Sequence, residues 1–164
     1  MVRWIDGLVG GLVAGVVSMV YFTVVAVAWL GEMSINEFFA QPARLIPQLR
    51  GTAPSVALTL VGVVLYLGLA VLLGLVYGRF STTRPSTRRL PNSLFWGTFY
   101  GLATWLLVHD VFVPWTGVVD VEPLWEGLAG CVLFGLVLSE MVAVAGRRSA
   151  LVAQELGLPS GAIG

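Results

Sequence analysis

Five ionisable residues lie inside or at the ends of long apolar stretches of this 164-residue chain: Asp6, His109, Asp110, Glu126 and Glu140. An ionisable group in an apolar environment is costly, so these residues are candidate functional groups. His109, the only histidine, has a side chain that can accept a proton or ligate haem or a metal ion. One histidine and one cysteine do not complete a zinc site or bis-histidine haem ligation within one chain. We therefore predict no cofactor, and a metal at His109 would require a dimer interface.

Motifs typical of soluble enzymes are absent from the sequence. It has no glycine-rich phosphate loop between a strand and a helix, no Cys/His spacing of a metal site and no nucleophile elbow. The sequence therefore predicts a protein without catalytic activity of its own.

The composition excludes several classes of protein. Hydrophobic residues make up 57% of the chain and charged residues 11%, and the mean hydropathy is +0.90. A water-soluble domain of this size cannot bury so many apolar residues, and disorder and nucleic-acid binding require far more polar or basic sequences. Nine arginines and nine acidic residues balance, and the single Cys131 permits no internal disulfide.

Four apolar stretches are each long enough to cross a hydrocarbon core of about 30 Å, which requires a helix of about 20 residues. They cover residues 5–30, 56–80, 94–115 and 124–146. Because they are apolar on all sides and do not alternate, helices are the conformation that satisfies their backbone amides in lipid. The sequence predicts an all-α protein: one membrane domain, residues 1–164, with four transmembrane helices in an antiparallel bundle.

The positions of the arginines predict the orientation of the bundle in the membrane. Arginine is enriched on the cytoplasmic side of membrane proteins. Seven arginines fall on one side of the four-span arrangement and only Arg44 and Arg50 on the other; the seven are Arg3, Arg79, Arg84, Arg88, Arg89, Arg147 and Arg148. We expect a cytoplasmic loop at 81–93, a cytoplasmic tail at 147–164 and both termini in the cytoplasm.

The external segment 34–50 carries a helix signal between the first two spans. Ser34 and Glu37 have the spacing of a capping box, and apolar residues recur after them at helical intervals. Pro42 and Pro47 interrupt the pattern. We expect a short interfacial helix whose apolar face is directed at lipid.

Small residues recur every fourth position in the predicted spans. In lipid, helices associate through close packing, so such stripes are contact surfaces. They contact either one another inside the bundle or a second subunit, so we expect a homo-oligomer or membership of a membrane complex. The stripes contain Gly7, Gly11, Gly15, Gly74, Gly78, Gly97, Gly101, Gly127, Cys131 and Gly135.

The candidate polar residues fall near the two faces of the predicted membrane. Asp6 and Glu140 lie within about two helical turns of the cytoplasmic edge, where Arg79 or Arg147 can pair with them. The middle of the bundle offers only uncharged polar groups: Ser18, Thr23, Thr59, Tyr66 and Thr104.

The outer face is predicted to hold the remaining candidates. His109 and Cys131 each lie about 10 Å from the outer end of their predicted span, so we expect them at the same depth in the membrane. Asp110 and Glu126 are expected to be solvated carboxylates near the headgroups.

Three functional hypotheses follow. The first is an accessory or self-associating membrane component. The second is permeation of a proton, an ion or a small solute, with His109 and Asp110 at an outer vestibule and Glu140 at the inner mouth. The third is a haem or metal protein that uses His109 across a dimer interface.

The C-terminal third of the chain, residues 94–148, resembles the YagU-like inner-membrane proteins. The shared pattern consists of Trp96-Gly97, Gly101, Val108-His109, Pro114, Gly117, Ser139-Glu140 and Arg147-Arg148. This resemblance implies a bacterial cytoplasmic-membrane protein of unassigned biochemical function. Members of that family can carry a further histidine in the last span, where this chain has Cys131.

Overall fold

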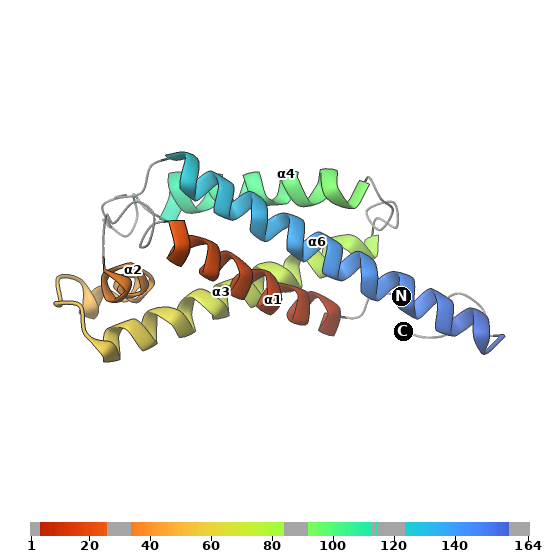
Figure 1. The fold of residues 1–164 in the computed structure, drawn as a ribbon, viewed down its shortest axis with the longest axis horizontal. Coiled ribbons are helices and arrows are strands. Elements are labelled where there is room, and N and C mark those ends of the chain that lie inside the picture. The colour runs from red at the N-terminus through yellow and green to blue at the C-terminus, as the bar shows by residue number, and fades with distance from the viewer. Residues whose placement is uncertain (1–3, 26–33, 84–91, 113, 115–123, 158–164) are drawn as a thin grey trace.

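The computed structural model describes residues 4–25, 34–83, 92–112, 114 and 124–157, and within these ranges every regular element is helical. The long helices lie side by side along the molecule (Figure 1). The elements are α1 (Trp4–Phe22), α2 (Ile35–Ala40), η2 (Pro42–Leu45), η3 (Pro47–Leu49), α3 (Val56–Thr83), α4 (Asn92–Leu107), η5 (Val108–Phe112) and α6 (Leu124–Glu155). The predicted all-α class is confirmed.

Three of the helical stretches are long and apolar enough to cross a membrane. They are Trp4–Val25, Val56–Thr83 and Trp125–Val152. Helices α3 and α6 begin at residues 56 and 124, as predicted for the second and fourth spans. The third predicted span, 94–115, is divided between α4 and the π-helical turn η5. Residues 26–30, 113 and 115 of the predicted spans lie outside the described residues.

The last helix is longer than its predicted span. Residues 147–164 were expected to form a tail, but α6 continues to Glu155. Alanine, leucine, glutamine and glutamate dominate this extension and favour a helix, so Gly146 alone does not end it. Gly157 has a φ of 63°, the left-handed conformation that commonly terminates helices. The extension of α6 projects beyond the rest of the bundle (Figure 1).

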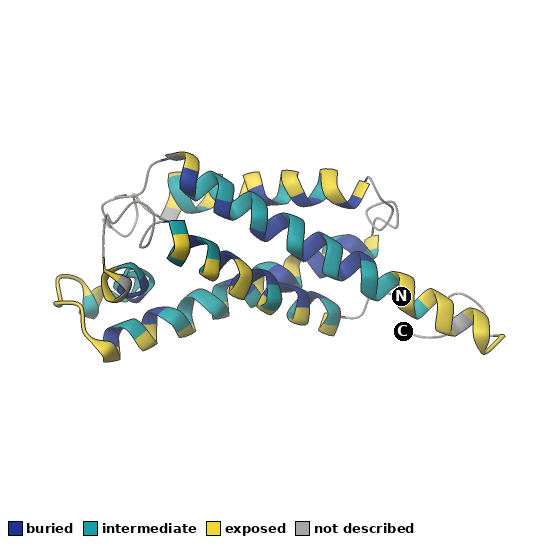
Figure 2. Ribbon diagram, in the orientation of Figure 1, coloured by how far each residue is buried: buried dark blue, intermediate teal, exposed yellow. Residues whose placement is uncertain are grey.

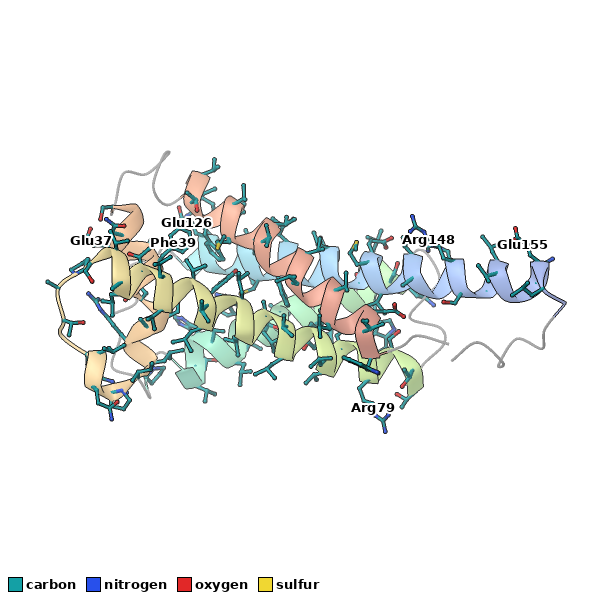
Figure 3. The ribbon with its side chains drawn as sticks, turned by 90° about the horizontal axis from the view of Figure 1, so that it is seen from below. Glu37, Phe39, Arg79, Glu126, Arg148 and Glu155 are labelled. Atoms are coloured by element: carbon teal, nitrogen blue, oxygen red, sulfur yellow. The ribbon has the colours of Figure 1, made fainter. Side chains whose placement is uncertain are left out.

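Charged side chains mark both ends of the bundle. Arg79 and Arg148 lie at one end and Glu37 and Glu126 at the other (Figure 3). We call the end with Arg79, Arg147 and Arg148 the arginine end, and the end with α2, η2 and η3 the short-helix end.

Helices α1 and α3 approach each other at glycines. A Cβ atom on Gly7 would lie 2.6 Å from the Gly74 carbonyl oxygen, and one on Gly11 would lie 2.6 Å from the Ala70 carbonyl oxygen. Gly15 faces the Ala70 methyl group, and Gly78 faces Gly7. These distances leave no room for side chains, so the backbones of α1 and α3 are in direct contact.

Helices α4 and α6 are packed in the same way. A Cβ atom on Gly101 would lie 2.7 Å from the Cα of Val132, and it would also meet the Cys131 carbonyl oxygen. Gly97 and Gly135 face each other across the same contact. The stripe at Gly127 is less enclosed, because that residue is only half-buried.

Helix α1 also packs on α6, which joins the two pairs. The Ser18 hydroxyl donates to the Gly130 carbonyl oxygen at 3.3 Å, and Gly10 faces Leu138 and Val142. Exposed positions lie along the outward faces of the long helices (Figure 2), and many of them are large apolar residues. Small residues therefore line the contacts between helices, larger side chains such as Tyr77, Phe134 and Leu138 fill the core, and apolar residues cover much of the exterior.

Segment 34–50 contains the predicted capping box, but its apolar face is not oriented as predicted. Ser34 and Glu37 exchange both bonds of the box, and Pro42 and Pro47 each begin a 3₁₀ helix, where their missing N–H is not needed. The apolar face was expected to meet lipid. Instead, the Phe39 carbonyl group packs against Gly62 of α3, and Ala40 and Ala43 are buried there too.

The glycine contacts predict a contrast between two substitutions on one helix. Gly74→Ala would place a methyl group against the backbone of Gly7 and Gly11, whereas a Cβ on Gly68 meets no atom within 4 Å. We expect Gly74→Ala to lower the free energy of unfolding in mixed micelles by about 1–3 kcal/mol. Gly68→Ala is the control and should change it by less than about 1 kcal/mol. Equal losses would contradict the close contact of α1 and α3.

The capping box predicts a pH effect on α2. The Glu37 carboxylate accepts hydrogen bonds from the Ser34 backbone and hydroxyl, both at 3.0 Å, and these lower its pKa below the ordinary value of 4.5. Because the folded pKa is lowered, charged Glu37 stabilises α2 above pH 4.5, and this contribution is lost as the pH falls through the lowered pKa.

Ser34→Ala removes the hydroxyl bond and keeps the backbone bond, so the pKa of Glu37 should rise part of the way to 4.5 in a ¹³C NMR titration. Ser55→Ala removes a comparable hydroxyl at the start of α3 and should leave that pKa unchanged. A Glu37 pKa unaffected by Ser34→Ala would refute the assignment.

Candidate functional site

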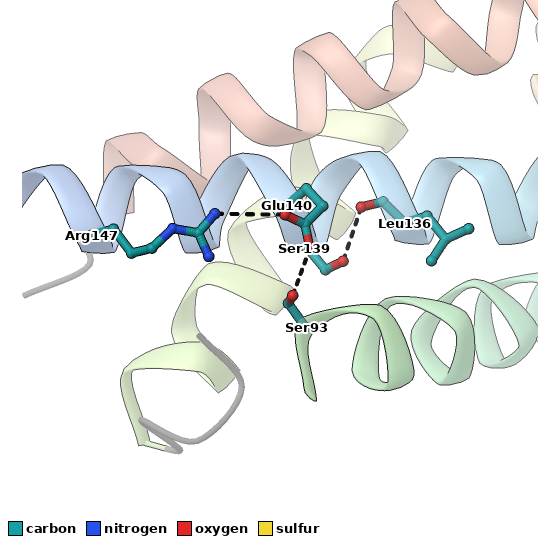
Figure 4. Close-up of polar contacts among 5 residues, drawn as sticks. All are labelled: Ser93, Leu136, Ser139, Glu140 and Arg147. Atoms are coloured by element: carbon teal, nitrogen blue, oxygen red, sulfur yellow. Dashed lines mark hydrogen bonds and ion pairs between the residues drawn. The ribbon is translucent and has the colours of Figure 1, made fainter. Parts of the chain in front are cut away.

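Glu140 is the centre of a polar cluster at the arginine end. The Ser93 hydroxyl of α4 donates to its Oε1 at 2.6 Å (Figure 4). Arg147 lies about two turns further along α6, and its Nη2 is 3.7 Å from Oε2 of Glu140. The predicted pairing with Arg147 is confirmed. Ser93 was missed by the sequence analysis, because the partner of α4 on α6 depends on the tertiary arrangement. The cluster neutralises Glu140 and joins two helices.

The neighbouring polar groups are bonded locally. The buried Ser139 hydroxyl donates to the Leu136 carbonyl oxygen at 2.9 Å (Figure 4). The same hydroxyl lies where a side chain on Gly97 would be, so it also fills the contact between α4 and α6. Ser139 therefore has a packing role in this cluster.

His109 lies at the opposite end of the same pair of helices. It is half-buried in η5, and its ring stacks on Trp105 with centroids 5.0 Å apart and planes 6° apart. Asp110, the next residue, is exposed as predicted. Glu140 is at the arginine end, so the structure does not bring His109, Asp110 and Glu140 together.

Glu126 contradicts the expectation of a solvated carboxylate. It is 0% exposed in the first turn of α6. The N-terminal turn of a helix favours a negative charge, and the packing of α6 against its neighbours covers the side chain. Asp6 has the equivalent position in the first turn of α1 and is half-buried.

Among the described residues, no group of three His, Cys, Asp or Glu side chains is placed to hold a metal ion. The hypothesis of haem or metal binding by His109 across a dimer interface stays a prediction.

An apolar cavity of about 250 Å³ lies in the half of the bundle nearer the short-helix end. Its walls come from α1, α2, η2, α3, α4, η5 and α6, and its polar members are Gln41, Tyr66, Thr104 and Cys131. Cys131 therefore has two roles: its carbonyl group packs against Gly101, and the residue lines the cavity.

No pattern in the sequence predicts the cavity. Tyr66 and Thr104 were recognised as polar groups in the middle of the bundle, which was the available signal. Their proximity to Gln41 and Pro42 follows from the packing of segment 34–50 on α3, and no local pattern indicates that packing.

Comparisons with protein-family models, curated proteins and solved structures find no match to this chain.

The cluster at Glu140 predicts graded effects of substitution. Glu140→Gln removes the ion pair and keeps an acceptor for Ser93. Because the side chains of Arg147 and Glu140 are 42% and 33% exposed, the loss should be only about 0.2–1 kcal/mol. Glu140→Leu also leaves the buried Ser93 hydroxyl without this acceptor and should cost about 1–3 kcal/mol more.

Unfolding of the full chain in mixed micelles, followed by circular dichroism, measures both losses. Glu155→Gln, at an exposed position of the same helix, should have no effect. If Glu140→Gln were as damaging as Glu140→Leu, the ion pair rather than the Ser93 bond would hold the cluster.

Proposed function

We propose that this chain is a four-span protein of the bacterial cytoplasmic membrane that acts as an accessory component without catalytic activity of its own. The observation that carries the proposal is the direct backbone contact of α1 with α3 and of α4 with α6. Such contacts are typical of helices that associate in lipid. They produce a fixed scaffold whose outward surface is apolar along the bundle.

The fourth span is supported by the length of α4 and η5 together. They cover residues 92–112 without a break, and twenty-one residues at about 1.5 Å each match a hydrocarbon core of about 30 Å. Glycines keep α4 in contact with α6, a candidate span, so the two helices share the same environment.

Both termini are proposed to be cytoplasmic. The described arginines of the arginine end, Arg79, Arg147 and Arg148, support this orientation, because cationic residues are retained on the cytoplasmic side. The resemblance of residues 94–148 to the YagU-like proteins agrees with a bacterial inner membrane, and membership of that family is part of the proposal.

We also propose that the chain self-associates or belongs to a membrane complex, through a surface other than the glycine stripes. The glycine stripes were predicted to contact either one another or a second subunit, and the glycines at the α1–α3 and α4–α6 contacts are used inside the bundle. A second copy would instead contact outward apolar residues, such as Val64 and Leu72 on either side of the unobstructed Gly68 of α3.

The permeation hypothesis has less support. A proton or ion moving between His109 and Glu140 would pass the cavity, whose lining is largely apolar. An apolar passage without charged groups opposes the movement of ions.

Cysteine labelling tests the span count and the orientation. In a Cys131→Ala background, single cysteines are introduced at Thr52, Thr83 and Ala150, all exposed. With four spans, a membrane-impermeant maleimide added to spheroplasts labels position 52 and spares 83 and 150. Inside-out vesicles give the reverse pattern and serve as the control.

With three spans, positions 83 and 150 would lie on opposite sides of the membrane. Labelling of position 150 but not 83 in spheroplasts would therefore refute the fourth span. Labelling of 83 and 150 together, with 52 protected, would refute the orientation.

A further inference from the structure

The cavity is a slot between α3 and α4. Leu65, Leu69 and Leu73 of α3 line one side at intervals of one helical turn, and Thr104 and Val108 line the other. From Leu65 to Leu73 the slot extends about 12 Å along the bundle. Its long axis therefore follows the helices.

Aromatic side chains close the slot on the side of the arginine end. The Tyr100 hydroxyl of α4 donates to the Leu73 carbonyl oxygen at 2.7 Å. The Tyr77 and Tyr100 rings lie 5.0 Å apart, and the Phe80 and Trp96 rings lie 5.3 Å apart. These contacts hold α3 to α4 beyond the slot, so its floor is near Leu73.

Segment 34–50 forms the wall at the other end. Phe38 of α2 packs against the Phe22 ring of α1, with centroids 5.8 Å apart, and Pro42 and Leu45 of η2 also line the slot. The wall carries one amide, Gln41. A molecule in the slot would therefore have its apolar part between α3 and α4 and its polar part beside η2.

Arg44 stands next to this polar end. Its Nη1 lies 3.4 Å from Gln41 Oε1, a long hydrogen bond. Among the described residues, its buried Nε has no hydrogen-bond partner and Arg44 forms no ion pair. A buried guanidinium N–H that has no acceptor is costly, and a phosphate oxygen is an acceptor that arginine binds well.

The apolar slot and the arginine together indicate the occupant. Apolar cavities of even about 150 Å³ stay free of water and take up apolar molecules. In a membrane the abundant apolar molecule is the lipid acyl chain. A slot of about 12 Å that begins near the middle of the bundle places Arg44 near headgroup level, since half of the hydrocarbon core is about 15 Å.

We propose that the slot between α3 and α4 binds one acyl chain of a membrane phospholipid, and that Arg44, beside Gln41, binds the phosphate of the same molecule. This inference rests on the proposed function for two points: α4 lies in the membrane as a fourth span, and, with both termini cytoplasmic, the lipid comes from the outer leaflet.

Native mass spectrometry of the full chain tests the proposal, after release from nanodiscs of phosphatidylglycerol. Wild-type protein should retain one phosphatidylglycerol per chain. Leu69→Trp fills the slot and should lower retention about tenfold or more. The matched control is Leu72→Trp, on the same helix at an outward residue that is 60% exposed, and it should retain the lipid. Cys131→Leu is a second slot-filling variant, to be used with circular dichroism as a check of folding.

A second pair of variants tests the phosphate contact. Arg44→Gln should lower retention of phosphatidylglycerol about tenfold, the size expected for one hydrogen bond to a charged group. It should leave unchanged the retention of diacylglycerol, which has the same chains and no phosphate. Arg50→Gln, at an exposed arginine of the same segment, is the control.

Three results would overturn the proposal. The first is that Leu69→Trp and Cys131→Leu fold and still retain as much phosphatidylglycerol as wild type. The second is that Arg44→Gln changes the retention of phosphatidylglycerol and of diacylglycerol equally, and the third is a dimer that Leu69→Trp abolishes without loss of lipid. Retention does not depend on orientation. A reversed labelling pattern with retention intact would therefore refute the orientation alone, and lost retention with the expected labelling would refute lipid binding alone.

Discussion

Direct backbone contact between helices is the constraint on which the rest of this structure depends. In lipid, apolar side chains gain little by leaving one apolar surrounding for another, so helices associate where their backbones can approach closely. Here Gly7 and Gly11 receive the backbone of α3, and Gly97 and Gly101 receive that of α6. Because these contacts are so close, the separation of each pair is fixed. Where α3 faces α4, aromatic residues replace glycine, and the wider spacing leaves room for the cavity.

The parts of the fold that depend on local pattern could be predicted. The starts of α3 and α6 follow from where apolar residues begin, and the capping box of Ser34 and Glu37 follows from a spacing of three. The pairing of Glu140 with Arg147 lies within two turns of one helix, so it was also accessible. In each case the interacting residues are close in sequence.

Features that depend on which elements become neighbours could not be predicted. Glu126 is buried because of the direction in which the first turn of α6 faces, and a carboxylate near a predicted headgroup region gives no sign of this. The contact of Phe39 with Gly62 turns an expected lipid-facing helix into a wall of the bundle. The cavity requires both this wall and the separation of α3 from α4, so neither Tyr66 nor Thr104 alone could indicate it.

The arrangement of contacts also has a consequence for biogenesis. The chain forms two helical hairpins, α1 with α3 and α4 with α6, and each hairpin completes its own glycine contact between successive long helices. The contact of α1 with α3 can form once Thr83 has been synthesised, before any of α4 exists. Folding units form in the order of synthesis. Assembly can thus proceed as insertion of two preformed hairpins, and the contact of Ser18 with Gly130 is the step that joins them.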